Sequence, residues 1–138
     1  MIDMTSDFGR HVDRRLSDEA VIWLTTVGED TGPHPRLVWF LWDGRTFLIY
    51  SQPDTWKVRH LSSRPRVALH LNSDEAGEDV TVFLGQAELI EGGPAAEDHE
   101  GYLGKYGERI AGLGMSPAEF AGEYSLAIRV TPSKLRGA

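Results

Sequence analysis

Runs of β-branched and aromatic residues, separated by short polar breaks, follow one another along most of the chain. The second and third runs flank Asp43-Gly44, a dipeptide that favours a tight hairpin. Gly85 inside the fifth run predicts a bulge, and Pro132 is expected to end the last. The pattern predicts about six strands, at residues 20–27, 36–42, 45–51, 67–71, 80–91 and 125–131.

Helical spacing interrupts these strands at three places. Residues 6–18 predict an N-terminal helix capped by Ser6, and residues 54–63 a short helix capped by Asp54. The third insertion spans 95–122 and contains a second helix start at Ser116-Pro117. Its first part should bury one helical face, formed by Tyr102, Tyr106, Ile110 and Leu113.

Consecutive β-rich runs with few helices predict a mostly β, antiparallel barrel rather than a parallel sheet. At 138 residues the chain is expected to be one domain, 1–138, with the barrel over about 20–131.

Composition excludes several classes of function. The chain has no cysteine, which excludes disulfides, thiolate nucleophiles and cysteine-bearing zinc sites. A net charge of −7 argues against nucleic acid as a partner. No segment approaches the roughly 20 apolar residues that span a bilayer, and the polar N-terminus does not resemble a signal peptide. We therefore expect a cytoplasmic protein with no membrane contact.

Charge is unevenly distributed along the chain. Six Lys or Arg residues lie between Arg36 and Arg66, whereas residues 67–104 contain none and are rich in Asp and Glu. A basic segment in an acidic protein suggests a local anion site. Ordinary solvated pairing with the acidic segment explains the same pattern equally well.

Sequence motifs for enzyme chemistry are absent. The five histidines lack metal-ligand spacing, and neither GxSxG, GxGxxG nor GxxxxGK[ST] occurs. The remaining feature is an aromatic strand, with Trp39 and Phe40, close in sequence to Lys57 in the first turn of a predicted helix. Simple core packing for the two aromatic residues and a solvated position for Lys57 are the alternatives.

Four segments together resemble the split β-barrels of the pyridoxamine 5'-phosphate oxidase-like family. They are PRLVWFL, FLIYSQPDTWKVRHL, RPRVALHLN and VFLGQAELI, and their order and spacing match best over residues 16–92. The resemblance is greater to the actinobacterial branch that uses the deazaflavin coenzyme F420. It implies a split β-barrel of the FMN/F420-binding type, in which the cofactor transfers a hydride to or from a small unsaturated or conjugated substrate.

The resemblance also implies the cofactor-binding residues. The ring would lie against Val38 and Trp39, above the strand end at Tyr50 and Ser51, and Thr55 and Lys57 would hold the phosphate. The other positions implied are Arg36, Arg59 and Gln86. The cofactor carries the reactivity, so no catalytic side chain and no metal are expected.

Two departures from the FMN-using oxidases favour the deazaflavin. Trp56 occupies the position of an arginine before the phosphate-binding lysine, and Leu41 occupies the position of a lysine. The alternatives are an FMN-binding oxidoreductase of the same fold and a non-catalytic flavin or deazaflavin binder. A haem-degrading relative is disfavoured because the C-terminal tail has no histidine.

A homodimer is expected, and the resemblance implies that its cofactor cleft lies at the subunit interface. Residues 21–24 and 37–42 are apolar on both alternations, so both faces of these strands should be buried. Trp39 and Trp42 should lie on opposite sides of their strand, one facing the barrel and the other the partner or the cofactor.

Overall fold

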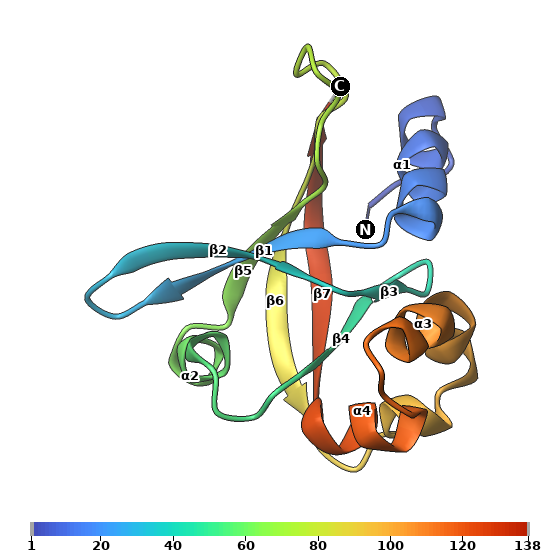
Figure 1. The fold of residues 1–138 in the computed structure, drawn as a ribbon. Helices are drawn as coiled ribbons and strands as arrows, with labels where there is room; N and C mark the ends of the chain where they lie inside the picture. The colour runs from blue at the N-terminus through green and yellow to red at the C-terminus, as the bar shows by residue number, and fades with distance from the viewer. Residues whose placement is uncertain (1, 138) are drawn as a thin grey trace.

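The computed structural model describes residues 2–137. Within them, seven strands form one antiparallel sheet that curves into a split barrel, in the order β2-β1-β5-β6-β7-β4-β3 (Figure 1). The strands are β1 (Ile22–Gly28), β2 (Gly32–Val38), β3 (Leu41–Trp42), β4 (Phe47–Ser51), β5 (Arg66–His70), β6 (Thr81–Ile90) and β7 (Leu126–Gly137). The predicted fold class is confirmed, with one strand more than the sequence indicated.

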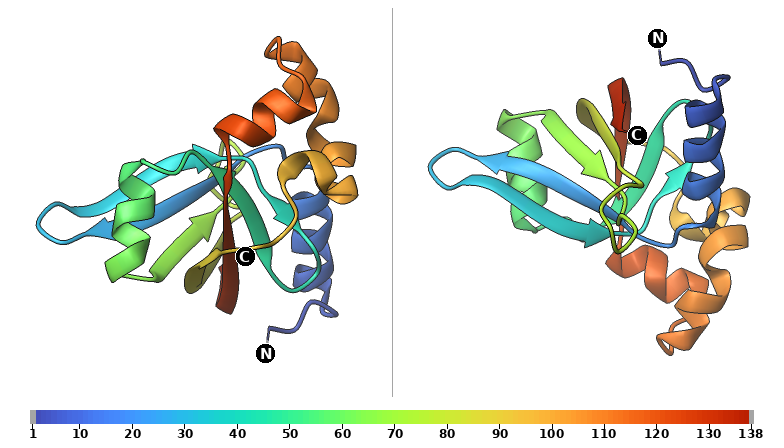
Figure 2. Two further views of the ribbon diagram at one scale, coloured as in Figure 1. Left: turned by 90° about the horizontal axis from the view of Figure 1, so that it is seen from below. Right: turned by 90° about the horizontal axis from the view of Figure 1, so that it is seen from above.

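Four α-helices and one 3-10 turn surround the sheet over residues 2–137 (Figure 2). Ser6 caps the first helix as predicted, and Ser116 forms a capping box with Glu119 at the last. The helices are α1 (Asp7–Asp18), α2 (Trp56–Ser63), α3 (Glu100–Gly112) and α4 (Pro117–Glu123), and η1 (Ala96–Asp98) precedes α3.

Two separate hydrophobic clusters hold these elements together. The first fills the barrel, where Phe40, Phe47 and Phe83 meet Val12 and Leu16 of α1. The second lies outside the barrel and joins β4 and β7 to α3 and α4 through residues such as Tyr50, Tyr102 and Phe120. Trp42 packs on the first cluster and Trp39 on the second, so the two tryptophans do lie on opposite sides.

The single strand predicted over 36–42 is wrong, because the chain leaves the sheet at Trp39 and Phe40. The backbone N–H of Phe40 donates to the hydroxyl of Tyr106 (2.8 Å), and its carbonyl accepts from Nζ of Lys105 (2.9 Å). Side chains of α3 thus form the hydrogen bonds that the backbone N–H and carbonyl of Phe40 would otherwise make to a neighbouring strand. The turn that follows is also longer than a two-residue hairpin, since Trp42 pairs with Phe47.

Pro132 does not end the last strand, which continues to Gly137. Pro132 pairs with Gly85 at the point where the register of β6 shifts, which confirms the predicted bulge. A Cβ on residue 85 would lie 2.5 Å from the carbonyl oxygen of Thr131, so only glycine allows this approach. The bulge accommodates a residue that has no N–H to donate.

Two details of the predicted helices also change. The cap of α2 is Thr55 rather than Asp54. Tyr102, Tyr106 and Ile110 are fully buried as expected, but Leu113 is 57% exposed because it follows the last turn of α3.

Candidate functional site

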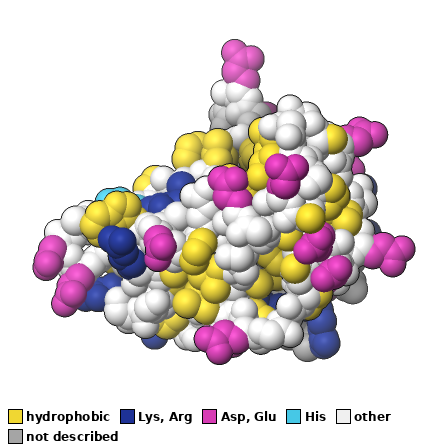
Figure 3. Space-filling view, turned by 60° about the horizontal axis from the view of Figure 1, so that its bottom comes forward, with side chains coloured by type: hydrophobic (Ala, Val, Ile, Leu, Met, Phe, Trp, Pro, Cys, Tyr) yellow, Lys and Arg dark blue, Asp and Glu magenta, His cyan; other side chains and the backbone are white. Residues whose placement is uncertain are grey.

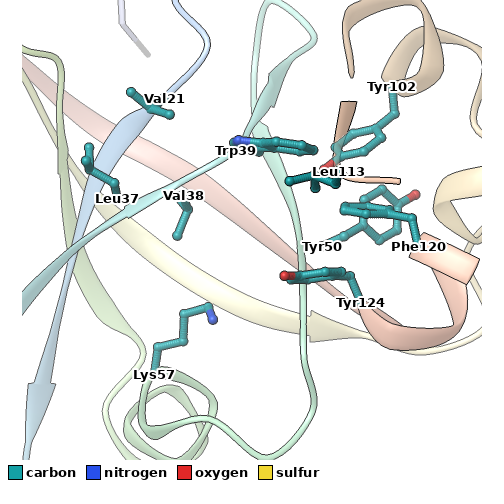
Figure 4. Close-up of a pocket in the computed structure, with 10 residues that line it drawn as sticks. All are labelled: Val21, Leu37, Val38, Trp39, Tyr50, Lys57, Tyr102, Leu113, Phe120 and Tyr124. Atoms are coloured by element: carbon teal, nitrogen blue, oxygen red, sulfur yellow. The ribbon is translucent and has the colours of Figure 1, made fainter. Parts of the chain in front are cut away.

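A cleft of about 390 Å³ opens between β2, the end of β4, α2 and the α3–α4 pair (Figure 4). It has an aromatic end and a cationic end. Trp39, Tyr50, Tyr102, Phe120 and Tyr124 form the aromatic end, and Lys57 approaches from the opposite side beside Val38. Three aliphatic residues complete the lining, namely Val21, Leu37 and Leu113. An apolar cleft with few charged groups suits a flat ligand that carries an anionic arm.

The strand break creates the aromatic end. Having left the sheet, Trp39 stacks on Tyr106 of α3, with ring centroids 4.7 Å apart and planes 5° apart. Its ring also stacks on Phe120 of α4, which in turn stacks on Tyr124. Offset parallel rings of this kind form flat apolar walls.

The cationic end consists of Lys57, in the first turn of α2, with Arg36 close by on β2. Within residues 2–137, the Lys57 ammonium donates one hydrogen bond, to the hydroxyl of Thr55 at 3.4 Å. Burial, together with the nearby charge of Arg36, lowers the pKa of Lys57 to about 8. Nε of Arg36 is buried without a hydrogen-bond acceptor within residues 2–137. Neither side chain forms an ion pair with a carboxylate of the described chain, which leaves both available to an anion.

Two histidines lie near these cations, His34 on β2 and His60 on α2. The rings of His34 and His60 lie 5.0 Å apart, and His60 shares a 2.9 Å hydrogen bond with the hydroxyl of Thr26. Burial, His34 and Arg36 all lower the pKa of His60, which favours its neutral form. The spacing of these four residues in the sequence could have indicated the cluster. His34 and Arg36 are two residues apart and so lie on one face of a strand, and Lys57 and His60 are three residues apart and so lie on one face of a helix.

The structure brings together four of the residues that the resemblance implied. Val38, Trp39, Tyr50 and Lys57 all line the cleft. Thr55 also lies close, as the residue that caps α2 and contacts Lys57. The Thr55 side chain makes no capping hydrogen bond, and Asp54 is exposed outside the helix. The carboxylate therefore does not occupy the helix start, where it would compete with an anion.

Three of the implied residues lie apart from the cleft. Ser51 is buried, and its hydroxyl donates to the carbonyl of Gln52. Arg59 is exposed, with its guanidinium 5.0 Å from the centroid of the Trp56 ring. Gln86 lines a separate depression on the sheet, together with Val27, Ser63, Arg64, Pro65 and Arg66.

Sequence reasoning missed the contribution of the last third of the chain. Tyr102 was expected only as a core residue, and Phe120 and Tyr124 were not singled out. The resemblance extended well only over residues 16–92, and the aromatic residues of α4 and its end have no pattern that distinguishes a cleft wall from a core.

Figure 3 shows the face that contains the lower part of Figure 1. Hydrophobic side chains gather at its centre, most of the basic ones lie at the left, and acidic ones are spread around the edge. No group of three or more His, Cys, Asp or Glu side chains forms a candidate metal site within residues 2–137. No helix in that range is long and apolar enough to cross a membrane.

The curved antiparallel sheet and its lateral cleft define a split-barrel protein. Residues 8–137 match the pyridoxamine 5'-phosphate oxidase family, described as "Pyridoxamine 5'-phosphate oxidase", and the chain belongs to that family. No curated protein matches the chain in sequence.

Solved structures of several different functions share the fold. A conserved hypothetical protein of Mycobacterium tuberculosis is 18% identical, with a TM-score of 0.73 over 96% of this chain and 83% of its own. An F420 reductase is 22% identical, with a TM-score of 0.70 over 90% and 94%. The heme storage protein HutZ of Vibrio cholerae is 16% identical, with a TM-score of 0.63 over 93% and 92%. At these identities the similarity concerns the fold alone.

Proposed function

We propose that this chain is a coenzyme F420-dependent oxidoreductase that transfers a hydride between the deazaflavin and a small unsaturated or conjugated substrate. The observation that carries the proposal is the pairing of an aromatic cleft with Lys57 and Arg36, two cations that have no acidic partner in the described chain. The donor set fits a flat ring with a phosphate-bearing arm.

Each group has a role that follows from its position. Lys57 and Arg36 bind the anionic arm, and Val38 and Trp39 offer a flat surface to the ring. The aromatic residues from α3 and α4 exclude water from the reacting face. The cofactor itself supplies the hydride chemistry, so the chain needs neither a nucleophile nor an acid–base pair.

Deazaflavin is preferred to FMN because of Trp56 and Leu41. Trp56 is 66% exposed and does not line the cleft, so position 56 supplies no cation for a phosphate. Leu41 packs against the second hydrophobic cluster. FMN remains the rival cofactor, and a binder without turnover is the rival class of protein.

Titration of the purified protein with oxidised F420 and with FMN tests the choice of cofactor. Trp39 lines the cleft, so binding should quench intrinsic tryptophan fluorescence. We expect tighter binding of F420 and a colourless protein on purification. Stoichiometric yellow FMN in the purified protein would establish the rival cofactor. Binding of F420 without reduction of any conjugated acceptor would favour the non-catalytic binder.

We further propose a homodimer in the cytoplasm that completes the cleft. The outer surface of β1, β2 and β5 carries half-buried or exposed apolar residues, of which Leu37 is 48% and Val27 36% exposed. Among the helices, α2 does contact β1, but through the buried pair His60 and Thr26, and Thr26 lies on the face of β1 opposite to Val27. Leu37 also lines the cleft, so a second copy on this surface would close it.

Sedimentation of the apo-protein at low micromolar concentration tests the assembly. A dimer should sediment at about twice 15.3 kDa, and Leu37→Asp should shift it toward monomer with loss of cofactor affinity. A wild-type monomer that binds cofactor at full strength would refute a shared cleft.

A further inference from the structure

Tyr102 and Tyr106 lie one turn apart on α3, and both are fully buried, but their hydroxyls differ. The hydroxyl of Tyr106 accepts from the N–H of Phe40 and lies 2.7 Å from the carbonyl of Ala20. The hydroxyl of Tyr102 is buried and has no hydrogen-bond partner within residues 2–137. An unpaired buried hydroxyl destabilises a fold, and phenylalanine would keep the same ring contacts without that loss.

Tyr102 is one of the residues that line the cleft, and its hydroxyl lies beneath the accessible surface there. Its ring is held edge-on by Tyr50, with centroids 4.8 Å apart, and it contacts Tyr106 and Phe120. In Figure 4 the ring enters from α3 with its hydroxyl directed toward the middle of the lining residues. Burial raises the pKa of Tyr102 far above its usual range, so the group keeps its proton and acts as a donor.

We propose that the aromatic end of the cleft is a subsite for a neutral, planar, conjugated carbonyl compound, whose oxygen accepts a hydrogen bond from the hydroxyl of Tyr102. Trp39, Phe120 and Tyr124 provide the flat walls, and none of the lining residues at this end is charged. The inference rests on the proposed function in that such a compound is a suitable hydride acceptor. Tyr102 is then a specificity-determining residue.

The first test compares Tyr102→Phe with Tyr106→Phe in the apo-protein by thermal unfolding. Tyr102→Phe should raise the unfolding midpoint by a few degrees or leave it unchanged, because it removes an unpaired hydroxyl. Tyr106→Phe should lower it, because it leaves the N–H of Phe40 without an acceptor. A fall in the midpoint for Tyr102→Phe comparable to that for Tyr106→Phe would show a structural role and overturn the proposal.

The second test uses 1-indanone and indane, a flat ketone and the hydrocarbon of nearly the same shape, in ligand-observed NMR titrations. Tyr102→Phe should weaken binding of 1-indanone by roughly 3- to 10-fold, as expected for one neutral hydrogen bond, and should not change indane. Equal effects on both ligands, or none on either, would overturn the hydrogen bond.

Titration of wild type and Tyr102→Phe with F420 and FMN separates this inference from the proposed function. If neither cofactor binds the wild type but 1-indanone binding still depends on Tyr102, the proposed function fails and the carbonyl subsite stands. If cofactor binds both proteins equally and Tyr102→Phe does not change the affinity for 1-indanone, the carbonyl subsite is refuted and the proposed function stands.

Discussion

Two lysine–tyrosine pairs in this protein are buried to a similar degree, but only one of them has its polar groups satisfied by hydrogen bonds to the backbone. Lys105 and Tyr106 on α3 bind the backbone of Phe40, and Lys105 also reaches the carbonyl of Leu16 at 3.3 Å. Lys57 and Tyr102 face the cleft, where Lys57 contacts only Thr55 and the Tyr102 hydroxyl has no partner within residues 2–137.

The pKa values do not distinguish the two lysines, since burial lowers the pKa of each to about 8. Their hydrogen bonds do distinguish them. Lys105 and Tyr106 stabilise the break after β2 that turns Trp39 toward α3, and their polar groups are already satisfied. Lys57 and Tyr102 retain donors that a ligand can use. Unsatisfied hydrogen-bonding capacity beside the cleft, rather than residue type or burial, is therefore the observation on which the proposed function rests.

The largest expected effect is on cofactor affinity. Lys57→Met should weaken F420 binding by about 10- to 150-fold, because a charge-assisted hydrogen bond contributes roughly 1.5–3 kcal/mol. Fluorescence titration measures the dissociation constant, with Lys105→Met as the matched control. An unchanged constant for Lys57→Met would mean that Lys57 is an ordinary solvated residue.

The reverse pattern is expected for stability. Lys105→Met should lower the free energy of unfolding by about 1–3 kcal/mol, since the carbonyls of Phe40 and Leu16 lose a charged donor that also lies 3.7 Å from the centroid of the Phe40 ring. Lys57→Met should not lower it, because burial already disfavours the charged form of Lys57 in the folded protein. Urea unfolding of both variants measures the difference. Equal losses in the free energy of unfolding would show that Lys57 and Lys105 have the same structural role.

A smaller effect is expected from pH. An anion binds the protonated form of Lys57, whose pKa in the free protein is lowered to about 8. Affinity should be constant below that pH and fall above it, by up to about tenfold per unit, until the pKa of the complex is reached. Lys57→Met should flatten the profile between pH 7 and 10. A decline that persists in the variant would assign it to another group.

The smallest effect is expected at Arg59, which is exposed on the outer side of α2. Arg59→Ala should weaken F420 binding only about two- to fivefold at low salt, and salt should abolish the difference because exposed charges are screened. The loss caused by Lys57→Met should survive 0.5 M salt, since Lys57 is partly buried. Titrations at two salt concentrations compare the variants.

Much of the fold follows from local pattern. The runs of apolar and β-branched residues at 20–27 and 80–91 predict strands, and one face of each strand is buried in the barrel. Ser6 and Ser116 predict the helix starts because capping involves residues only three positions apart. Lys57 does lie in the first turn of α2 as predicted, although the cap is Thr55 rather than Asp54 and makes no side-chain hydrogen bond.

Other features depend on partners far away in sequence. The break at Phe40 exists because Tyr106, 66 residues later, binds its N–H, and the final strand passes Pro132 because Gly85 leaves room for it. The sequence by itself therefore determined the barrel and its basic segment. Only the tertiary structure decided which tyrosine is satisfied and which faces a cleft, because a hydroxyl's partners are set by contacts between elements that no local pattern specifies.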